Sequence, residues 1–175
     1  EDIVVGTVAS GRMCEEAEDV VGFFVNTLPI RMCVAGSATF DSLASRTRDA
    51  VLDAMANQNL PFDLIVRALN PKRDTSRNPV FQALFTLDDS PWRELDLPGL
   101  KIAEIDIPGR SCQFDLAVYG RHDGTHLSFV WRYASDLFEE PTIRRWALQF
   151  ARLLDRLADG GSAVIDSLVV DEKNY

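Results

Sequence analysis

The hydrophobic and polar positions follow two different periods along the chain, which predicts both strands and helices. Runs rich in β-branched and aromatic residues favour strands, and they cover residues 2–8, 23–34, 80–87, 100–107, 113–120 and 125–133. Pro29 lies inside the second run and indicates an edge strand, a bulge or a broken strand. Asp123 and Gly124 separate the last two runs, and this pair is typical of a tight hairpin turn. Residues 80–87 are too apolar for us to expect them on the surface.

Apolar residues recur at helical spacing in residues 40–56 and 141–157, which predicts two amphipathic helices. A shorter helix is predicted to begin near Pro61, with Asn59 as its N-cap, and to stop at Asn70 because a proline follows. Strands and helices alternate irregularly. This pattern predicts an α/β fold in which helices flank a mixed sheet.

The composition describes one folded domain and excludes several classes of protein. The 175 residues are 46% hydrophobic and 26% charged, which suits a single domain and excludes a disordered chain. A formal net charge of −9 argues against general nucleic-acid binding, since that needs a positive surface. No apolar run reaches the roughly 20 residues of a membrane helix, and no basic region typical of a signal peptide is seen. The strand-like start at residue 2 suggests that the sequence opens inside a larger fold.

Neither the cysteines nor the histidines form a pattern typical of a metal or catalytic site. Cys14, Cys33 and Cys112 are widely spaced, so we expect reduced thiols, no zinc site and a cytoplasmic protein. His122 and His126 flank the predicted hairpin turn, where exposed turn residues are the simplest interpretation. The chain has no nucleophile elbow and no glycine-rich phosphate loop. No catalytic residue is therefore predicted within it.

Three polar runs are open to both a structural and a functional interpretation. In the first, Val21–Arg31, the pair Asn26 and Thr27 interrupts an apolar strand. The second, Asn57–Asp63, lies between two predicted helices, and the third, Arg73–Pro79, precedes an apolar strand. Taken singly, a bulge, a helix cap and an internally hydrogen-bonded turn explain them. If the polar pair is buried, its groups need protein partners or a substrate.

In this order the three runs resemble the motifs of the condensation domains of nonribosomal peptide synthetases. Residues 22–31 match Gly-x-Phe-Val-Asn-Thr…Arg, and residues 73–79 match Arg-Asp-x-Ser-Arg-Asn-Pro without exception. Residues 57–63 match [His/Asn]-Gln-Asp-x-Pro-Phe-Glu except at Asn59 and Asp63. The Val-Asn-Thr segment resembles peptide-bond-forming domains rather than epimerisation or cyclisation domains. The matched positions expected to serve the family's structure are Gly22, Gln58, Pro61, Phe62, Arg73, Asp74, Ser76, Arg77, Asn78 and Pro79.

The resemblance implies a chloramphenicol-acetyltransferase-like lobe. Residues 1–161 would be the C-terminal lobe of a condensation domain, and residues 162–175 a linker-like tail towards a following domain. The family's catalytic signature, His-His-x-x-x-Asp-Gly, is absent from the chain, so the isolated chain is predicted to be inactive. Asn26 and Thr27 are expected to support the active-site tunnel, and Arg31 to pair with the aspartate of the missing signature.

The resemblance also implies substrates and partners. Donor and acceptor thioesters would arrive on the phosphopantetheine arms of peptidyl carrier proteins, and the domain would join them by a peptide bond. Further partners would be the N-terminal lobe and an adjacent adenylation domain; no directly bound cofactor, metal, nucleic acid or membrane is expected. Residues 2–12 resemble the tunnel floor, and residues near 106–135 should include a latch that reaches the other lobe.

Two alternatives remain at this point. The chain could be a non-catalytic module that docks a carrier protein or an adenylation domain, or a standalone member of the superfamily without a first lobe. If it is one lobe of two, it should expose apolar side chains where the other lobe would sit, and it should self-associate.

Overall fold

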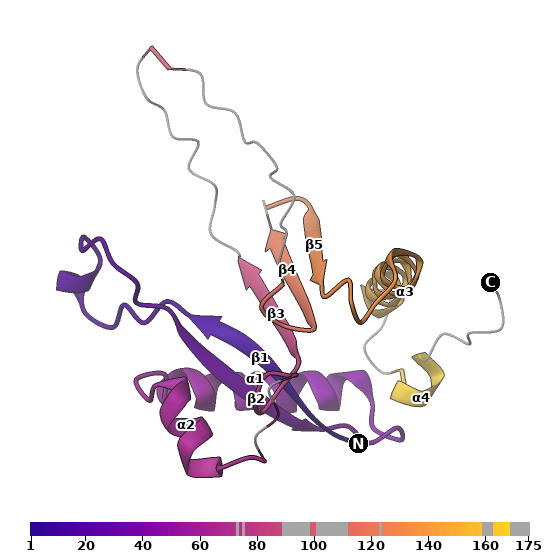
Figure 1. The fold of residues 1–175 in the computed structure, drawn as a ribbon. Helices are drawn as coiled ribbons and strands as arrows, with labels where there is room; N and C mark the ends of the chain where they lie inside the picture. Colours follow the sequence, from indigo (N-terminus) through magenta and orange to yellow (C-terminus); the bar gives the residue numbers. More distant parts are fainter. Residues whose placement is uncertain are drawn as a thin grey trace.

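The computed structural model describes residues 1–72, 74, 76–88, 99–100, 112–122, 124–158 and 163–168. Within these residues a mixed five-stranded sheet is flanked by helices, which confirms the predicted α/β fold (Figure 1). The strands are β1 (Asp2–Ala9), β2 (Asn26–Cys33), β3 (Ala83–Asp88), β4 (Leu116–His122) and β5 (Leu127–Tyr133). The helices are α1 (Phe40–Ala56), α2 (Phe62–Leu69), α3 (Glu140–Ala158) and the single turn α4 (Ile165–Leu168), and a 3₁₀ turn covers Glu15–Ala17.

The strand order β2-β1-β3-β4-β5 places antiparallel pairs at the two edges and parallel pairs in the centre. Pro29 pairs with Gly6 on the edge strand β2, which confirms the edge interpretation, because an edge strand tolerates a missing N–H. The predicted hairpin is also confirmed, since β4 and β5 are antiparallel neighbours. Gly124 in its turn has a φ of 96°, which favours glycine.

Two hydrophobic clusters lie on opposite faces of the sheet. Successive side chains of a strand point to opposite faces, and the register separates the faces because Leu28 pairs with Thr7 while Leu84 pairs with Gly6. The cluster against α1 is built on Ala9, Leu28 and Ile30. The cluster on the other face is built on Phe81, Leu84 and Ala117.

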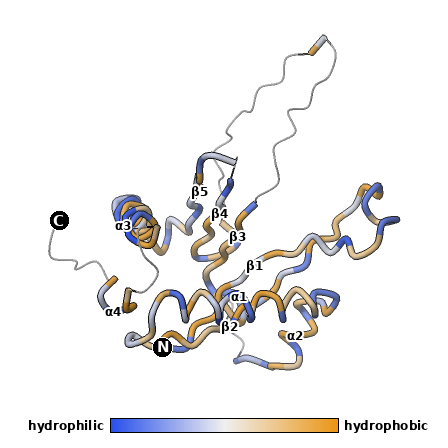
Figure 2. The backbone as a smooth tube through the Cα atoms, turned by 180° about the vertical axis from the view of Figure 1, so that it is seen from behind, coloured by the Kyte–Doolittle hydropathy of each residue, from blue (hydrophilic) through white to orange (hydrophobic). Residues whose placement is uncertain are grey.

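Different helices lie beside different strands of the sheet. Figure 1 shows α1 and α2 beside β1 and β2, and α3 beside β5. The ring of Phe150 on α3 lies 5.0 Å from that of Phe129 and 5.7 Å from that of Trp131, both on β5. In Figure 2 the central strands are predominantly hydrophobic, whereas α3 carries both hydrophobic and hydrophilic positions. This pattern agrees with the amphipathic stripe predicted for that helix.

A single aromatic ring joins the sheet to the segments around it. Phe81 is only 1% exposed, and its ring centroid lies 5.5 Å from those of Phe62 and Phe114. A Cβ atom at Gly6 would come within 2.1 Å of the Phe81 ring. Only a residue without a side chain therefore lets this ring lie against β1.

Strand β3 begins three residues later than the pattern predicted. The N–H of Phe81 donates to the carbonyl of Pro79 over 2.9 Å, across Val80 with a φ of 74°. This is a γ-turn, a strained conformation for a β-branched residue. The expected burial of the whole run was also wrong at its end, because Leu87 is 52% exposed.

The predicted N-cap of α2 was wrong as well. Pro61 occupies the N-cap position and provides no side-chain hydrogen bond. The Oδ1 atom of Asn26 on β2 instead accepts a hydrogen bond from the N–H of Phe62 over 3.2 Å. A pattern local to the helix start could not show a cap that lies far away along the chain. The helix ends as predicted, with Asn70 in the left-handed conformation.

Some predictions lie wholly or partly outside the described residues. These are the strand at 100–107, the first part of the latch near 106–135, and most of the tail at 162–175. In the part of the tail that is described, Val164 forms a bridge with Thr39, and Leu168 is only 7% exposed. This part of the tail is thus packed against the start of α1.

Gly6→Ala is expected to lower the free energy of unfolding by about 1–3 kcal/mol, because the added methyl group must displace the buried Phe81 ring. Urea unfolding followed by circular dichroism measures this. Val8→Ala on the same strand, where the residue is 37% exposed, is the control and should cost clearly less. Equal stability of the two variants would contradict the proposed contact.

Candidate functional site

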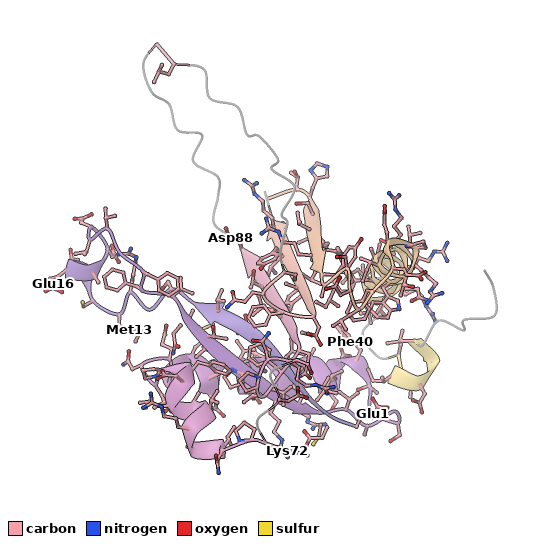
Figure 3. All side chains as sticks on the ribbon, viewed as in Figure 1. Glu1, Met13, Glu16, Phe40, Lys72 and Asp88 are labelled. Carbon is pink, nitrogen blue, oxygen red and sulfur yellow. The ribbon has the colours of Figure 1, made fainter. Side chains whose placement is uncertain are left out.

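A pocket of about 470 Å³ lies between the second half of α2 and the segment that leads to β3. Its lining residues are Val66, Arg67, Asn70, Pro71, Lys72, Asp74, Arg77, Asn78, Pro79, Val80 and Gln82. Three of these carry a positive charge and one a negative charge, although the whole chain has a net charge of −9. The pocket therefore offers a locally favourable place for an anion. Figure 3 labels Lys72 on the segment that follows α2.

The third polar run forms one wall of this pocket through an internally hydrogen-bonded turn. Oδ1 of Asp74 accepts hydrogen bonds from the backbone N–H of Ser76 at 2.9 Å and from its hydroxyl at 2.6 Å. Nε of Arg77 lies 3.1 Å from the other carboxylate oxygen of Asp74. Nδ2 of Asn78 donates to the carbonyl of Gln113 over 2.6 Å, which ties the turn to the segment before β4. The described residues of this run thus form an internally hydrogen-bonded turn, while a functional role of the run stays a prediction.

The side-chain amide of Asn26, in the polar pair of the first run, is satisfied by the protein itself. Nδ2 of Asn26 donates to the carbonyls of Gln58 and Leu60, both over 2.8 Å. Its Oδ1 accepts from the N–H of Thr27 over 3.0 Å, as well as from Phe62. Asn26 and Thr27 are both half-buried. One side chain thus joins the first run to the second.

Arg31 forms a two-pronged ion pair within the chain. Its Nε lies 3.0 Å from Oδ1 of Asp2, and its Nη2 lies 2.7 Å from Oδ2. The hydrogen bonds from Arg31 lower the pKa of Asp2, and those to Asp2 raise the pKa of Arg31. The two side chains are 74% and 49% exposed, so solvent screens the pair and it stabilises the fold little. The predicted pairing with a signature aspartate stays a prediction.

A feature that the sequence did not reveal is the arginine that organises the loop between β1 and β2. Nη1 of Arg12 donates to the carbonyls of Ala17, Glu18 and Val20, and its guanidinium lies 4.4 Å from the Phe24 ring centroid. Met13 and Glu16 of this loop lie at the far end of the hairpin from Glu1 (Figure 3). No local pattern marks these contacts, since the acceptors are backbone carbonyls.

The same loop presents apolar side chains to solvent. Val21 and Phe23 are 102% and 91% exposed. Met13, Val20 and Val25 are exposed as well. The loop therefore exposes apolar side chains. That another lobe would cover them, and that the chain self-associates, both stay predictions.

The family role expected for the remaining motif residues stays a prediction. Gly22 is exposed in the loop, and Phe62 contacts Phe81; Arg73 lies outside the described residues.

Across the described ranges, no group of three or more His, Cys, Asp or Glu side chains could hold a metal ion. The three cysteines are free thiols. None of the helices in the described part is long and apolar enough to cross a bilayer.

Comparison with known proteins identifies the family. The family model of the condensation domain matches residues 1–174. One of the proteins that make up the linear gramicidin synthase of Brevibacillus parabrevis is 35% identical over 172 residues, which cover 97% of this chain and 2% of that protein. The chain therefore belongs to the condensation domain family.

Solved structures confirm the fold. A four-domain nonribosomal peptide synthetase in its holo form has a TM-score of 0.86 at 22% identity, over 99% of this chain and 14% of that one. The condensation domain of the monacolin K polyketide synthase has a TM-score of 0.83 at 19% identity, over 94% of this chain and 38% of that one. These similarities confirm the chloramphenicol-acetyltransferase-like fold. The chain spans only a small part of the gramicidin synthase protein and a minor part of both structures.

The carboxyl group of Asp74 is expected to titrate below the ordinary value of 3.8, because the two hydrogen bonds from Ser76 and then the charge of Arg77 lower its pKa. Because the folded turn favours the ionised carboxylate, it is stabilised at pH values above the ordinary pKa of 3.8. This stabilisation is lost as the pH falls through the lowered pKa of Asp74. Carboxyl ¹³C NMR measures the titration. Ser76→Ala should raise the pKa more than Arg77→Leu does, and the reverse order would contradict the assigned cause.

Proposed function

We propose that residues 1–161 are the C-terminal lobe of a peptide-bond-forming condensation domain. The observation that carries this proposal is the convergence of the three motif runs. Asn26 of the first run holds the turn of the second, and the helix that follows this turn forms a pocket with the third. The order of these motifs and the family match support the same proposal.

The general base for the reaction would come from outside this chain. Attack of an acceptor amine on a donor thioester needs the amine to lose a proton near neutral pH. The two histidines of the chain, His122 and His126, lie at the ends of the hairpin strands and belong to no His-His pair. The contribution of this lobe would then be to orient substrates and partners, and positioning alone can supply much of a rate.

Arg31 would orient the loop that carries the signature aspartate. Its side chain is 74% exposed while paired with Asp2, so a second carboxylate can approach it. A guanidinium can hold two carboxylate oxygens in a fixed plane, which a lysine ammonium cannot. Arg31 would thus be a positioning residue.

The chain alone is expected to form no dipeptide from two loaded carrier proteins, whereas the chain joined to a lobe with the His-His-x-x-x-Asp-Gly signature should form it. In the joined protein, Arg31→Ala should lower the rate about 10- to 100-fold, and Arg31→Lys should not restore it. Mass spectrometry of the released product measures both. Substantial product from the chain alone would overturn the proposal.

The pocket supports a role in carrier-protein docking, which was the second candidate function. A phosphopantetheine arm carries a phosphodiester, and Arg67, Lys72 and Arg77 would provide cations for it. Arg67 and Arg77 also pair with Asp63 and Asp74, at 3.6 and 3.1 Å. Both pairs are exposed, so solvent screens them and the guanidinium groups stay accessible to an anion. We propose the pocket as the place where this lobe receives the arm, with an N-terminal lobe and an adenylation domain as further partners and the cytoplasm as location.

Lys72→Glu is expected to weaken binding of a holo carrier protein by about 10-fold, because it reverses one of three cationic charges around the anion. Arg145→Glu, an exposed cation on α3, is the control for the change in net charge and should alter the affinity less than about twofold. Titration followed by NMR measures both. Equal weakening by the two variants would contradict a specific pocket.

A further inference from the structure

We propose that Asn26 is a positioning residue that sets the shape of the α2 pocket from the edge strand of the sheet. The identity of the pocket's ligand rests on the proposed function. The role of Asn26 in placing α2 is independent of that function, because it follows from contacts within the chain.

The four hydrogen bonds of Asn26 use its whole amide group. Nδ2 donates both of its hydrogens, to the carbonyls of Gln58 and Leu60, and Oδ1 accepts from the N–H groups of Thr27 and Phe62. An amide is the short side chain that both donates twice and accepts twice. An aspartate could keep the two accepted bonds but would place a carboxylate against two carbonyl oxygens.

Helix α2 depends on this contact for its start. It has only eight residues, and its own N-cap provides no side-chain bond. The first N–H groups of a helix have no partner within it, and so short a helix is marginal by itself. Asn26 supplies the missing acceptor at Phe62 and also holds the turn that leads into the helix.

The start of α2 and the pocket are connected through a few contacts. The second half of the same helix provides Val66, Arg67 and Asn70 to the pocket. Phe62 at its start lies against Phe81, and the residue before Phe81 is the strained Val80, which lines the opposite wall. A strained turn persists only where its surroundings hold it. Loss of the Asn26 bonds should therefore move both walls.

The test uses three variants of the chain and two measurements. Asn26→Ala removes every bond, and Asn26→Asp keeps only the accepted ones. Ile30→Val is the stability control, because Ile30 is buried on the same strand but packs against α1. Hydrogen exchange reports the amides of α2 separately from those of β1, and a titration with 4′-phosphopantetheine reports the pocket.

Asn26→Ala should accelerate exchange of the α2 amides by about 10-fold or more relative to those of β1, as expected for local opening. The affinity for 4′-phosphopantetheine should fall by a similar factor. Asn26→Asp should keep the protection of the first helical turn but speed exchange in residues 57–60. Ile30→Val should leave α2 exchange and affinity unchanged.

Two outcomes would overturn the inference. One is unchanged α2 exchange in Asn26→Ala, and the other is an equal loss of affinity in Ile30→Val. If the unsubstituted chain does not bind 4′-phosphopantetheine, the proposed ligand of the pocket is wrong. The exchange data then decide the role of Asn26 alone, since they need no ligand.

Discussion

The Phe81 ring lies on the bare backbone of Gly6, and the hydrophobic cluster on that face of the sheet is built around this contact. The ring has almost no exposed surface and joins three parts of the chain that are distant in sequence: β1, the start of α2 and the segment before β4. Interiors are packed as densely as organic crystals, so a ring in this position leaves no room for a side chain on β1. The γ-turn at Val80 follows from the same constraint, because the chain must turn sharply to place the ring there and still begin β3 at Ala83.

Polar side chains of the motif runs form hydrogen bonds within the chain. Among the described residues of the motif runs, three polar side chains bond to backbone atoms or to another side chain of the same run. Asn26 bonds to the turn before α2, Asp74 to Ser76, and Asn78 to the segment before β4. None of these side chains is fully buried, so their hydrogen bonds fix the local chain path rather than compensate for burial. The described motif side chains thus hold turns and segments of this chain in place, and Arg77 of the third run lines one pocket together with Arg67 and Lys72, which lie outside the runs.

The chain builds its own core and still exposes apolar side chains to solvent. Two clusters cover the two faces of the sheet, whereas Val21 and Phe23 extend from a loop that Arg12 holds by backbone carbonyls. An ordered loop with exposed apolar residues is typical of an interaction surface. This combination is what the proposed assignment to one of two lobes requires.

The sequence by itself determined the elements and the family. Periodicity is a local property, so the strands β1 and β2, the helices α1 and α3 and the β4–β5 hairpin follow from residues that are neighbours in the chain. The motifs are local as well, which is why the condensation domain family could be identified from three short runs. The edge position of Pro29 followed from the chemistry of one residue.

Only the tertiary structure decided which residues meet. Asn59 has the right chemistry and spacing for a helix cap, yet Asn26 caps α2 because the fold brings β2 beside the helix start. Arg31 meets Asp2 through the register of β1 and β2, and the pocket exists because α2 ends beside the turn at Asp74. Such contacts depend on how strands and helices pack in three dimensions, and no pattern within one segment contains that information.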